Sequence, residues 1–278
     1  MPTLAWLGSS DGALHALCAL TTLGSLLLVF NVLPGPGLVL TWLGYLSLVS
    51  NGGIFMGYQW DALLLESLFV ALFVVPWRGL RPGLVRERAP PWAGVWLVRL
   101  LVFKLIFLSG WVKLASGDPV WADLSALDYH YWTQPLPTFT SAWAADAPAW
   151  TRDLGIRVMF AIELVFPFFV FVPLRRLRYL AAFGILALML GIGLTGNYGY
   201  FNLLTCTLTL MCFDDGALRR LVPRRWRSRV PDSHAFPYAR PPVPRRVPLG
   251  IGAGLLAFLS MSTFVVSTTE PDDDPPDL

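Results

Sequence analysis

Charged side chains inside long apolar segments are the residues of this sequence most able to do chemistry. They are Asp61, Glu66, Arg99, Lys104, Lys113 and Glu163. A charge in hydrocarbon is costly, so such residues usually face the interior of a helix bundle beside a partner. Carboxylates and amines at that depth can relay protons, conduct ions or bind a substrate. A neutralised set can equally serve only to lock neighbouring helices together, and both interpretations stay open.

The depth of each charge follows from its place in its apolar segment. At about 1.5 Å of rise per residue, Glu66, Lys104 and Glu163 lie near the middles of three successive segments. Arg99 lies about five residues toward the cytoplasmic side of that plane, and Asp61 about as far toward the outside. We predict a buried charge network in which Glu66, Lys104 and Glu163 meet at the bilayer midplane and Arg99 can reach Glu66.

Two hypotheses, for catalysis and for transport, depend on this network. A desolvated Lys104 could act as a base or a nucleophile, but two neighbouring glutamates favour its charged, unreactive form. Glu66 and Glu163 could carry protons in a transporter, although the sequence has no internal repeat and no paired broken segments. Lys113 lies near the outer end of its segment, where its long side chain can snorkel to the interface. The sequence therefore assigns no catalytic residue, and it favours a function other than catalysis.

The composition is that of a membrane protein. Of the 278 residues, 55% are hydrophobic and only 14% are charged, whereas a soluble domain carries roughly a quarter charged residues. We predict an all-α, polytopic bundle of seven or eight transmembrane helices. The chain divides into a membrane helix core (1–213), a basic cytoplasmic loop (214–247) and a final span with an acidic tail (248–278). The apolar segments are 12–33, 37–51, 53–77, 92–115, 154–173, 178–196, 199–213 and 247–266.

The distribution of arginine predicts the orientation of these spans. Basic residues concentrate in 78–88, 175–178 and 214–248, and such loops stay in the cytoplasm. The 116–153 loop and the C-terminal "EPDDDPPDL" are acidic, so we place both outside. With eight spans the N-terminus is also outside, whereas a re-entrant 37–51 would place it inside. The first segment lacks the features of a cleavable signal peptide and is expected to remain as an anchor.

Several classes of site are not expected. Cys18, Cys206 and Cys212 all lie in apolar segments without a CxxC pair, which argues against a disulfide framework or a redox site. We expect no metal and no cofactor. The arginine runs could bind nucleic acid, but we interpret them as topology determinants that rest on acidic head groups. The expected partner is therefore the lipid bilayer and not nucleic acid. Nineteen arginines against two lysines suggest a GC-rich, bacterial genome.

The outer loop, residues 116–153, contains the run "GDPVWADLSALDYHYWTQPLP". Residues 117–119 have turn chemistry, and helical spacing then places Trp121, Leu124, Leu127 and Tyr131 on one side of an amphipathic interfacial helix. The aspartates and the histidine could instead form a metal or acid–base site, but no two of them have a recognised ligand spacing. We predict a partner-docking interface formed by Trp121, Asp123, Asp128, Tyr129, His130 and Tyr131.

A polar turn, "TGNYGYFNLLT", joins two apolar segments near residue 200. Gly196 and Gly199 permit a tight turn. Asn197, Tyr198 and Asn202 can satisfy the backbone groups that an irregular segment leaves open at membrane depth. The turn is either a helical hairpin corner or a polar site that opens outward.

Four stretches of the sequence occur together in the order and spacing of a known family. They are "FMGYQWDALLLES", "FKLIFLSGWVKLASGDPVWADLSALDYHYWTQPLPT", "ELVFPFF" and "TGNYGYFNLLTCTLTLMCFDD". On these motifs the chain resembles the lipase maturation factor family. The run "SGDPxWxDLxALxYHYxTQPLP" is the most specific of them.

The resemblance implies a polytopic protein which, in animals, lies in the endoplasmic reticulum membrane and helps secreted homodimeric lipases reach their active fold. It also implies kinship with the membrane domain of vitamin K-dependent carboxylases, so a membrane enzyme stays an alternative, as does a proton-coupled transporter. Longer members carry a soluble C-terminal domain assigned to lipase contact, and we expect this chain to be the membrane core without it. The expected function is to assist the maturation of an exported client such as a lipase, from the cytoplasmic membrane if the protein is bacterial. The family offers no catalytic residues to transfer.

Overall fold

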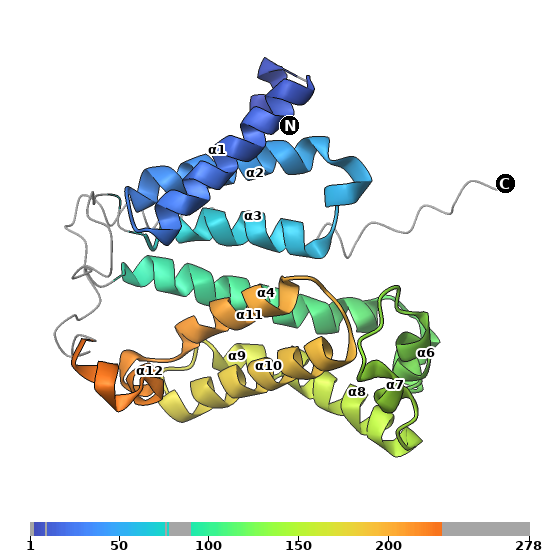
Figure 1. Cartoon of the computed structure of the whole chain (residues 1–278). Helices are drawn as coiled ribbons and strands as arrows, with labels where there is room; N and C mark the ends of the chain where they lie inside the picture. Colours follow the sequence, from blue (N-terminus) through green and yellow to red (C-terminus); the bar gives the residue numbers. More distant parts are fainter. Residues whose placement is uncertain (1–2, 9, 76, 78–89, 230–278) are drawn as a thin grey trace. The chain divides into compact units, whose positions relative to one another are not determined.

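The computed structural model describes residues 3–8, 10–75, 77 and 90–229, and its regular structure there is helical, without a β-strand. The all-α class is therefore confirmed for this part of the chain. The predicted span 247–266, the arginines at 78–88 and the acidic tail lie outside the described residues. In chain order (Figure 1), the helices are η1 (Leu4–Leu7), α1 (Asp11–Val29), α2 (Pro34–Asn51), η2 (Gly53–Met56), α3 (Gln59–Ala71), α4 (Trp92–Ala115), α5 (Pro119–Ala122), α6 (Ala126–Thr133), α7 (Ser141–Ala145), α8 (Ala149–Leu164), α9 (Phe166–Phe169), α10 (Arg175–Thr195), α11 (Phe201–Thr209), η3 (Leu210–Cys212), α12 (Asp215–Leu221) and η4 (Arg224–Arg229).

The chain forms two compact units. The first contains the described residues up to Val98 together with 214–229, and the second contains Arg99–Phe213. In the described part of the chain, three helices are long and apolar enough to cross a membrane, namely α1, α4 and α10. The chain is therefore a helical membrane protein with three clear candidate spans.

The predicted apolar segments within the described residues coincide with helices, but several helices are shorter than the segments. The segment 53–77 contains η2 before α3, which begins only at Gln59. In the segment 154–173, α8 ends at Leu164 and α9 begins at Phe166. Pro167 explains this break, because it has no N–H to continue the ladder of α8. Helix length and apolarity alone thus support three spans, fewer than the seven or eight predicted.

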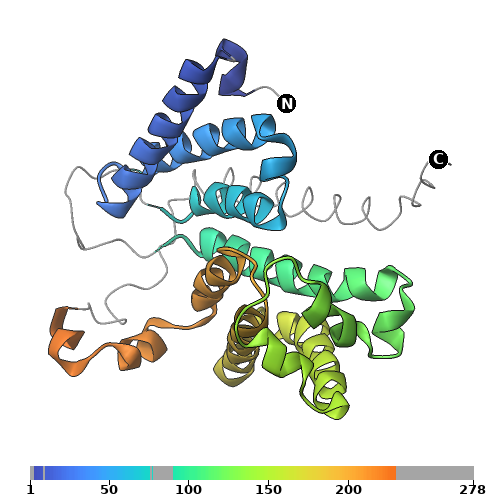
Figure 2. The ribbon, with the colours of Figure 1, turned by 45° about the vertical axis from the view of Figure 1, so that its right-hand side comes forward.

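In the first unit, α1 and α2 approach each other closely through small residues and lie side by side (Figure 2). A Cβ built on Gly24 of α1 would lie 2.8 Å from the carbonyl oxygen of Gly37 and 2.8 Å from the backbone nitrogen of Thr41, both in α2. Farther along, a Cβ on Gly44 would overlap the hydroxyl of Thr21. Such small residues let helices approach in lipid, where close packing instead of water exclusion drives their association.

Hydrogen bonds fix one end of this unit. The Tyr45 hydroxyl in α2 donates to the carboxylate of Asp61 in α3 at 2.5 Å. The backbone N–H of Leu4, in η1, donates to the Ser47 hydroxyl at 3.0 Å. The segment before α1, the end of α2 and the start of α3 therefore lie together.

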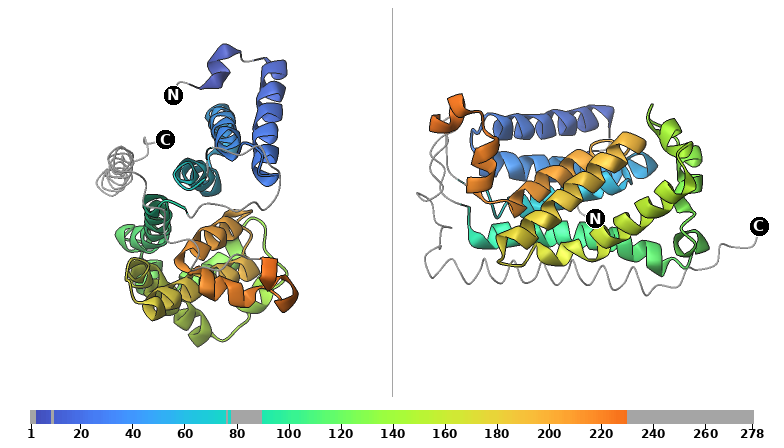
Figure 3. Two further views of the ribbon diagram at one scale, coloured as in Figure 1. Left: turned by 90° about the vertical axis from the view of Figure 1, so that its left-hand side faces the viewer. Right: turned by 90° about the horizontal axis from the view of Figure 1, so that it is seen from below.

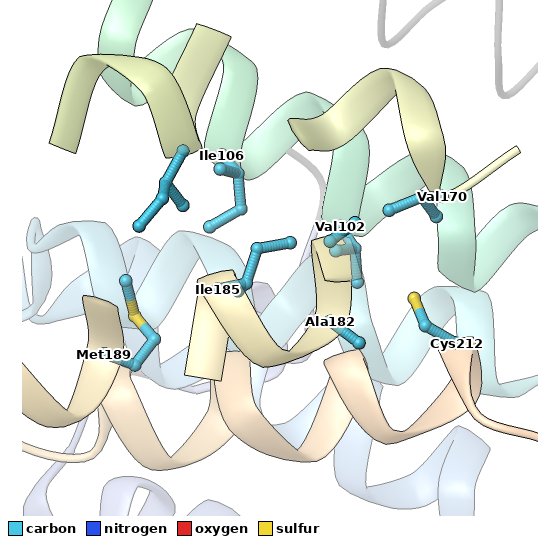
Figure 4. Close-up of a cluster of buried hydrophobic side chains, with 9 residues drawn as sticks. Val102, Ile106, Val170, Ala182, Ile185, Met189 and Cys212 are labelled. Carbon is cyan, nitrogen blue, oxygen red and sulfur yellow. The ribbon is translucent and has the colours of Figure 1, made fainter. Parts of the chain in front are cut away.

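The second unit is built around one apolar core (Figure 4). Its side chains come from α4, α8, the residue after α9, α10 and η3, which packs these helices against one another. In this core Val102 of α4, Ala182 of α10 and Cys212 of η3 are neighbours (Figure 4). The buried members are Val102, Ile106, Ile162, Val170, Ala181, Ala182, Ile185, Met189 and Cys212.

Helices α10 and α11 lie alongside each other after the turn at 196–200 (Figure 3). The short helices α6 and α7 gather where α8 begins and α10 ends (Figures 1 and 2). The core thus positions the outer loop against the end of a candidate span.

Replacing Gly24 by alanine should weaken the α1–α2 contact, because the new methyl group would meet backbone atoms of Gly37 and Thr41 that cannot rotate away. Overpacking of this kind costs about 1–3 kcal/mol, which corresponds to a melting temperature lowered by about 3–8 °C. Thermal unfolding of the purified protein in detergent measures this. Gly12→Ala in the same helix is the control, since its nearest atom, Ser10 Oγ, is 3.9 Å away. Equal melting temperatures for the two variants would contradict the close approach.

Candidate functional site

Asp61, a member of the predicted charge network, is 4% exposed and stabilises the start of α3. Its carboxylate accepts the Tyr45 hydroxyl at 2.5 Å and the backbone N–H of Tyr58 at 3.4 Å. Asp61 also lies in the first turn of α3, where the helix dipole favours a negative charge. These contacts give Asp61 a structural role between α2 and α3.

A largely buried charged pair of the second unit joins Lys113 of α4 to Glu163 of α8. The ammonium nitrogen lies 2.8 and 3.0 Å from the two carboxylate oxygens, and it also donates to the carbonyl oxygen of Ser109 at 2.8 Å. These bonds account for the three donors of an ammonium group. The Glu163 side chain is 4% exposed and that of Lys113 22%. The ring of Trp121 lies 5.6 Å from the ammonium and contacts Phe160 edge-on, so one aromatic ring lies over the lysine of this pair.

This pairing differs from the sequence prediction that Glu163 contacts Lys104 and that Lys113 snorkels. The physical reason is the close crossing of α4 and α8 at Gly110, where a Cβ would lie 2.8 Å from the Cβ of Glu163. Lys113 follows Gly110 by one helical turn on the same face. An estimate of depth from segment midpoints does not include such a crossing. It therefore paired Glu163 with Lys104, which lies farther from the outer end of α4 than Lys113.

The remaining members of the network belong to different units. Glu66 is half-buried on α3 in the first unit, and Lys104 is half-buried on α4 in the second. Their meeting stays a prediction. Arg99 is 8% exposed, and its Nε donates to the carbonyl oxygen of Met211 in η3 at 3.4 Å. Arg99 thus binds a helix end, a role that the sequence pattern does not indicate.

The predicted interfacial helix of the outer loop is interrupted. Asp118 caps α5 by accepting the N–H of Val120 at 3.1 Å. Asp123 then accepts the N–H and the hydroxyl of Ser125 at 2.9 and 2.6 Å, and these hydrogen bonds lower the pKa of the exposed Asp123 carboxyl. Leu124 adopts a left-handed conformation with φ of 66°. One helix is therefore replaced by two short ones, α5 and α6, with a turn between them.

The outer loop and the polar turn form one structure, although the sequence analysis treated them as two regions. His130 Nε2 and the Tyr198 hydroxyl are 3.2 Å apart, and their rings are nearly parallel at 10°. The Tyr131 hydroxyl also interacts with the side chain of Thr195. The Gln134 amide donates to the carbonyl oxygen of Thr195 at 2.9 Å. The run "YHYWTQ" thus lies against the end of α10 and the turn that follows it.

The loop also satisfies the last carbonyl groups of α10. Thr138 and Thr140 both donate their hydroxyls to the carbonyl oxygen of Leu194, the former at 2.6 Å. The final carbonyls of any helix lack intrahelical partners, and hydroxyl groups of the loop supply partners for one of them here. The loop therefore completes the helix end.

Arg152, at the start of α8, holds the loop from the other side. Its guanidinium binds the carboxylate of Asp128 and donates to the carbonyl oxygens of Ala145 and Ala147 at 2.9 and 2.5 Å. Arg152, the single arginine or lysine of the 116–153 loop, thus fixes α6 and α7 to α8.

In the polar turn, two of the three predicted residues form hydrogen bonds. Asn197 Oδ1 accepts the N–H of Gly199 at 3.3 Å, and Tyr198 binds His130. Asn202 Oδ1 is buried without a hydrogen-bond partner among the described residues. The turn thus holds the loop, and a polar site there stays a prediction.

The predicted docking residues divide into two groups. Asp123, Asp128 and Tyr129 are exposed, whereas Trp121, His130 and Tyr131 are half-buried and make the internal contacts described above. The sequence analysis did not include most of the exposed apolar side chains of the loop. Helical spacing could have indicated Trp132, because it lies one turn after the exposed Tyr129 in α6. These exposed side chains are Tyr129, Trp132, Leu136, Phe139, Trp143 and Trp150.

Burial keeps the junction between loop and turn uncharged. It lowers the pKa of His130 and raises the pKa values of Tyr131 and Tyr198, in each case because the charged form loses its hydration. Within the described residues, no group of three or more His, Cys, Asp or Glu side chains is arranged to hold a metal ion. The junction is thus suited to positioning the loop.

Removing Lys113 should destabilise the second unit strongly, because Lys113→Met leaves the carboxylate of Glu163 buried without its partner. We expect a loss of about 3–5 kcal/mol in the free energy of unfolding, measured by denaturation in mixed micelles. The double variant Lys113→Met with Glu163→Leu removes both charges and should recover most of this loss. If the double variant is as unstable as the single one, the pair is not the source of the stability.

Acid should loosen the contact between the loop and the turn. Because the pKa of His130 is lower in the folded protein, its contribution to stability is complete above about pH 6.5 and is lost as the pH falls below that value. The melting temperature should therefore drop between about pH 7.5 and pH 5.5. The drop should be smaller in His130→Gln and unchanged in His15→Gln, since His15 is exposed on α1. An equal drop in both variants would contradict this role.

Comparison with known proteins adds independent evidence. The family described as "Lipase maturation factor transmembrane domain" matches residues 1–220. Lipase maturation factor 2 from Homo sapiens is 42% identical over 233 residues, which cover 77% of this chain and 32% of the relative. The Rattus norvegicus protein of the same name is 40% identical over 249 residues, covering 84% and 35%. Lipase maturation factor 1 from Bos taurus is 34% identical over 227 residues, covering 80% and 40%.

The chain spans about a third of the length of the lipase maturation factor 2 relatives that it matches. No solved structure matches it. The match to the family over residues 1–220, with identities of 34–42% to its named members, is sufficient for assignment. The chain belongs to the lipase maturation factor family.

Proposed function

We propose that this chain is the membrane core of a maturation factor that assists the folding of an exported lipase. The names of its relatives support a lipase client. The single observation that carries the proposal is the form of the outer loop, in which Gln134, Thr138 and Thr140 bind the end of α10 while several aromatic rings are exposed. Such a surface is preformed, and it is suited to the apolar patches that an incompletely folded client exposes.

The exposure of the rings is large. Trp132 is 72% exposed, Phe139 82%, Trp143 66% and Trp150 66%. Aromatic side chains are enriched in protein interfaces and at the boundary between membrane and water. The polar side chains of Gln134, Thr138 and Thr140 bind the end of α10 and do not surround these rings. The loop therefore offers apolar area without breaking its own hydrogen bonds.

The position of the loop supports a location of this surface at one membrane boundary. The loop connects the end of α4 with the start of α8 and binds the end of α10, and α4 and α10 are candidate spans. The opposite end of α10 carries Arg175 and Arg176, and basic ends remain in the cytoplasm. We infer that the rings face outside, where an exported client folds. That side is the exterior of a bacterial cytoplasmic membrane or the lumen of the endoplasmic reticulum.

The contacts of the first unit support an outside N-terminus and a larger number of spans. The backbone N–H of Leu4 donates to the Ser47 hydroxyl near the end of α2. Gly35, at the start of α2, lies against Trp77, because a Cβ built on Gly35 would lie 3.0 Å from that residue. Trp77 precedes the arginines of 78–88. The turn between α1 and α2 then lies at the cytoplasmic side, and both helices cross. With α3, α8–α9 and α11–η3 as short spans, the count reaches seven in the described chain.

The contacts of Lys113 and Glu163 weaken the enzyme alternative. That hypothesis places Lys104 between two glutamates, yet Glu163 binds Lys113, whose donors are all used. The pair then stabilises the crossing of α4 and α8, which supports the outer loop. The charges whose contacts are known thus have structural roles.

Site-specific crosslinking tests the docking surface. A photoreactive phenylalanine analogue at Trp132 or at Phe139 should crosslink to a co-expressed exported lipase during its folding. The same analogue at Leu203, which is 71% exposed on α11, is the control and should react only with lipid. Trp132→Ser should also lower the yield of active lipase, because truncated interface hot spots weaken binding by tenfold or more.

The contradicting result is specific. If positions 132 and 139 give only lipid adducts, like position 203, while lipase activity still depends on the protein, the loop anchors the chain in the interface and the client binds elsewhere.

A further inference from the structure

Arg178 is a buried cation at the basic end of α10. It is 8% exposed, although the sequence pattern groups it with the exposed Arg175 and Arg176 of the cytoplasmic loop. Its Nε donates to the carbonyl oxygen of Cys212 at 2.7 Å, and its guanidinium lies 5.7 Å from the Tyr179 ring. Arg178 therefore faces inward, against the end of η3.

The terminal nitrogens of Arg178 have no partner in the described chain. A guanidinium carries five N–H donors, and the one protein hydrogen bond of Arg178 uses only Nε. No carboxylate among the described residues forms an ion pair with it. A buried charge without a counter-ion is costly, so this arrangement favours an anion as a ligand.

Arg99 adds a second positive charge at the same helix end. It is also 8% exposed, and its Nε donates to Met211, the residue before Cys212. Two guanidinium groups thus bind successive carbonyl groups. The end of η3 therefore lies beside two guanidinium groups.

We propose that Arg178 binds the phosphate of an anionic phospholipid of the cytoplasmic leaflet. Arginine matches phosphate with paired N–H donors, and basic pockets between transmembrane helices on the cytoplasmic side are suited to anionic head groups. The proposal does not depend on the identity of the client.

Native mass spectrometry of the full chain, with dioleoyl phosphatidylglycerol as the probe and the phosphatidylcholine analogue as the neutral comparison, tests this site. The wild type should hold phosphatidylglycerol in preference, and Arg178→Gln should reduce that affinity about tenfold, the value of a lost charge-assisted contact. Arg176→Gln removes the same charge from an exposed position and should change the affinity by about twofold or less. Equal reductions in the two variants would overturn a specific site at Arg178.

Two further measurements keep the proposal testable if Arg178→Gln fails to fold. Arg178→Lys retains the charge but not the paired donors, so it should fold and bind phosphatidylglycerol less tightly than the wild type. The melting temperature of the wild type should rise with phosphatidylglycerol and not with phosphatidylcholine. Equal effects of the two lipids would overturn the proposal. So would stabilisation by inorganic phosphate alone, because the occupant would then be free phosphate.

Discussion

The fold depends on one constraint, which is that polar groups at membrane depth must find their partners within the protein. An unsatisfied polar group there costs several kcal/mol. Lys113 meets this constraint with Glu163 and the Ser109 carbonyl. The last carbonyl groups of α10 meet it with hydroxyl and amide groups of the outer loop. The same requirement therefore produces both the charged pair of the core and the shape of the loop that follows from it.

Close helix approach decides which partners meet. Gly110 brings α4 against the side chains of Glu163 and Leu164 in α8, so the lysine one turn farther along becomes the counter-ion. In the first unit, Gly24 has the same effect on α1 and α2. Small residues thus fix the register of each pair, because sliding by one residue would bring Cβ atoms into the neighbouring backbone. Charge pairing then follows from register, and depth in the bilayer is a secondary factor.

The sequence could predict the helical class, the apolar segments and the importance of the outer loop, since these depend on composition, periodicity and motif. It could not predict that Glu163 binds Lys113, because a helix crossing is not visible in one segment's midpoint. It also missed the turn at Leu124, whose left-handed backbone is unusual for leucine. The sequence also could not predict that Arg178 points inward. Three arginines within four residues are typical of a solvated loop, and Arg178 is buried because it binds a carbonyl group at the end of η3, which is distant in sequence.

Several side chains that the sequence analysis considered for chemistry have structural contacts. Lys113 has no donor left, Asp61 is bound to a tyrosine and a backbone N–H, and His130 is held in its neutral form by burial beside Tyr198. The described outer loop instead exposes aromatic rings, and the proposed docking of a client depends on these rings.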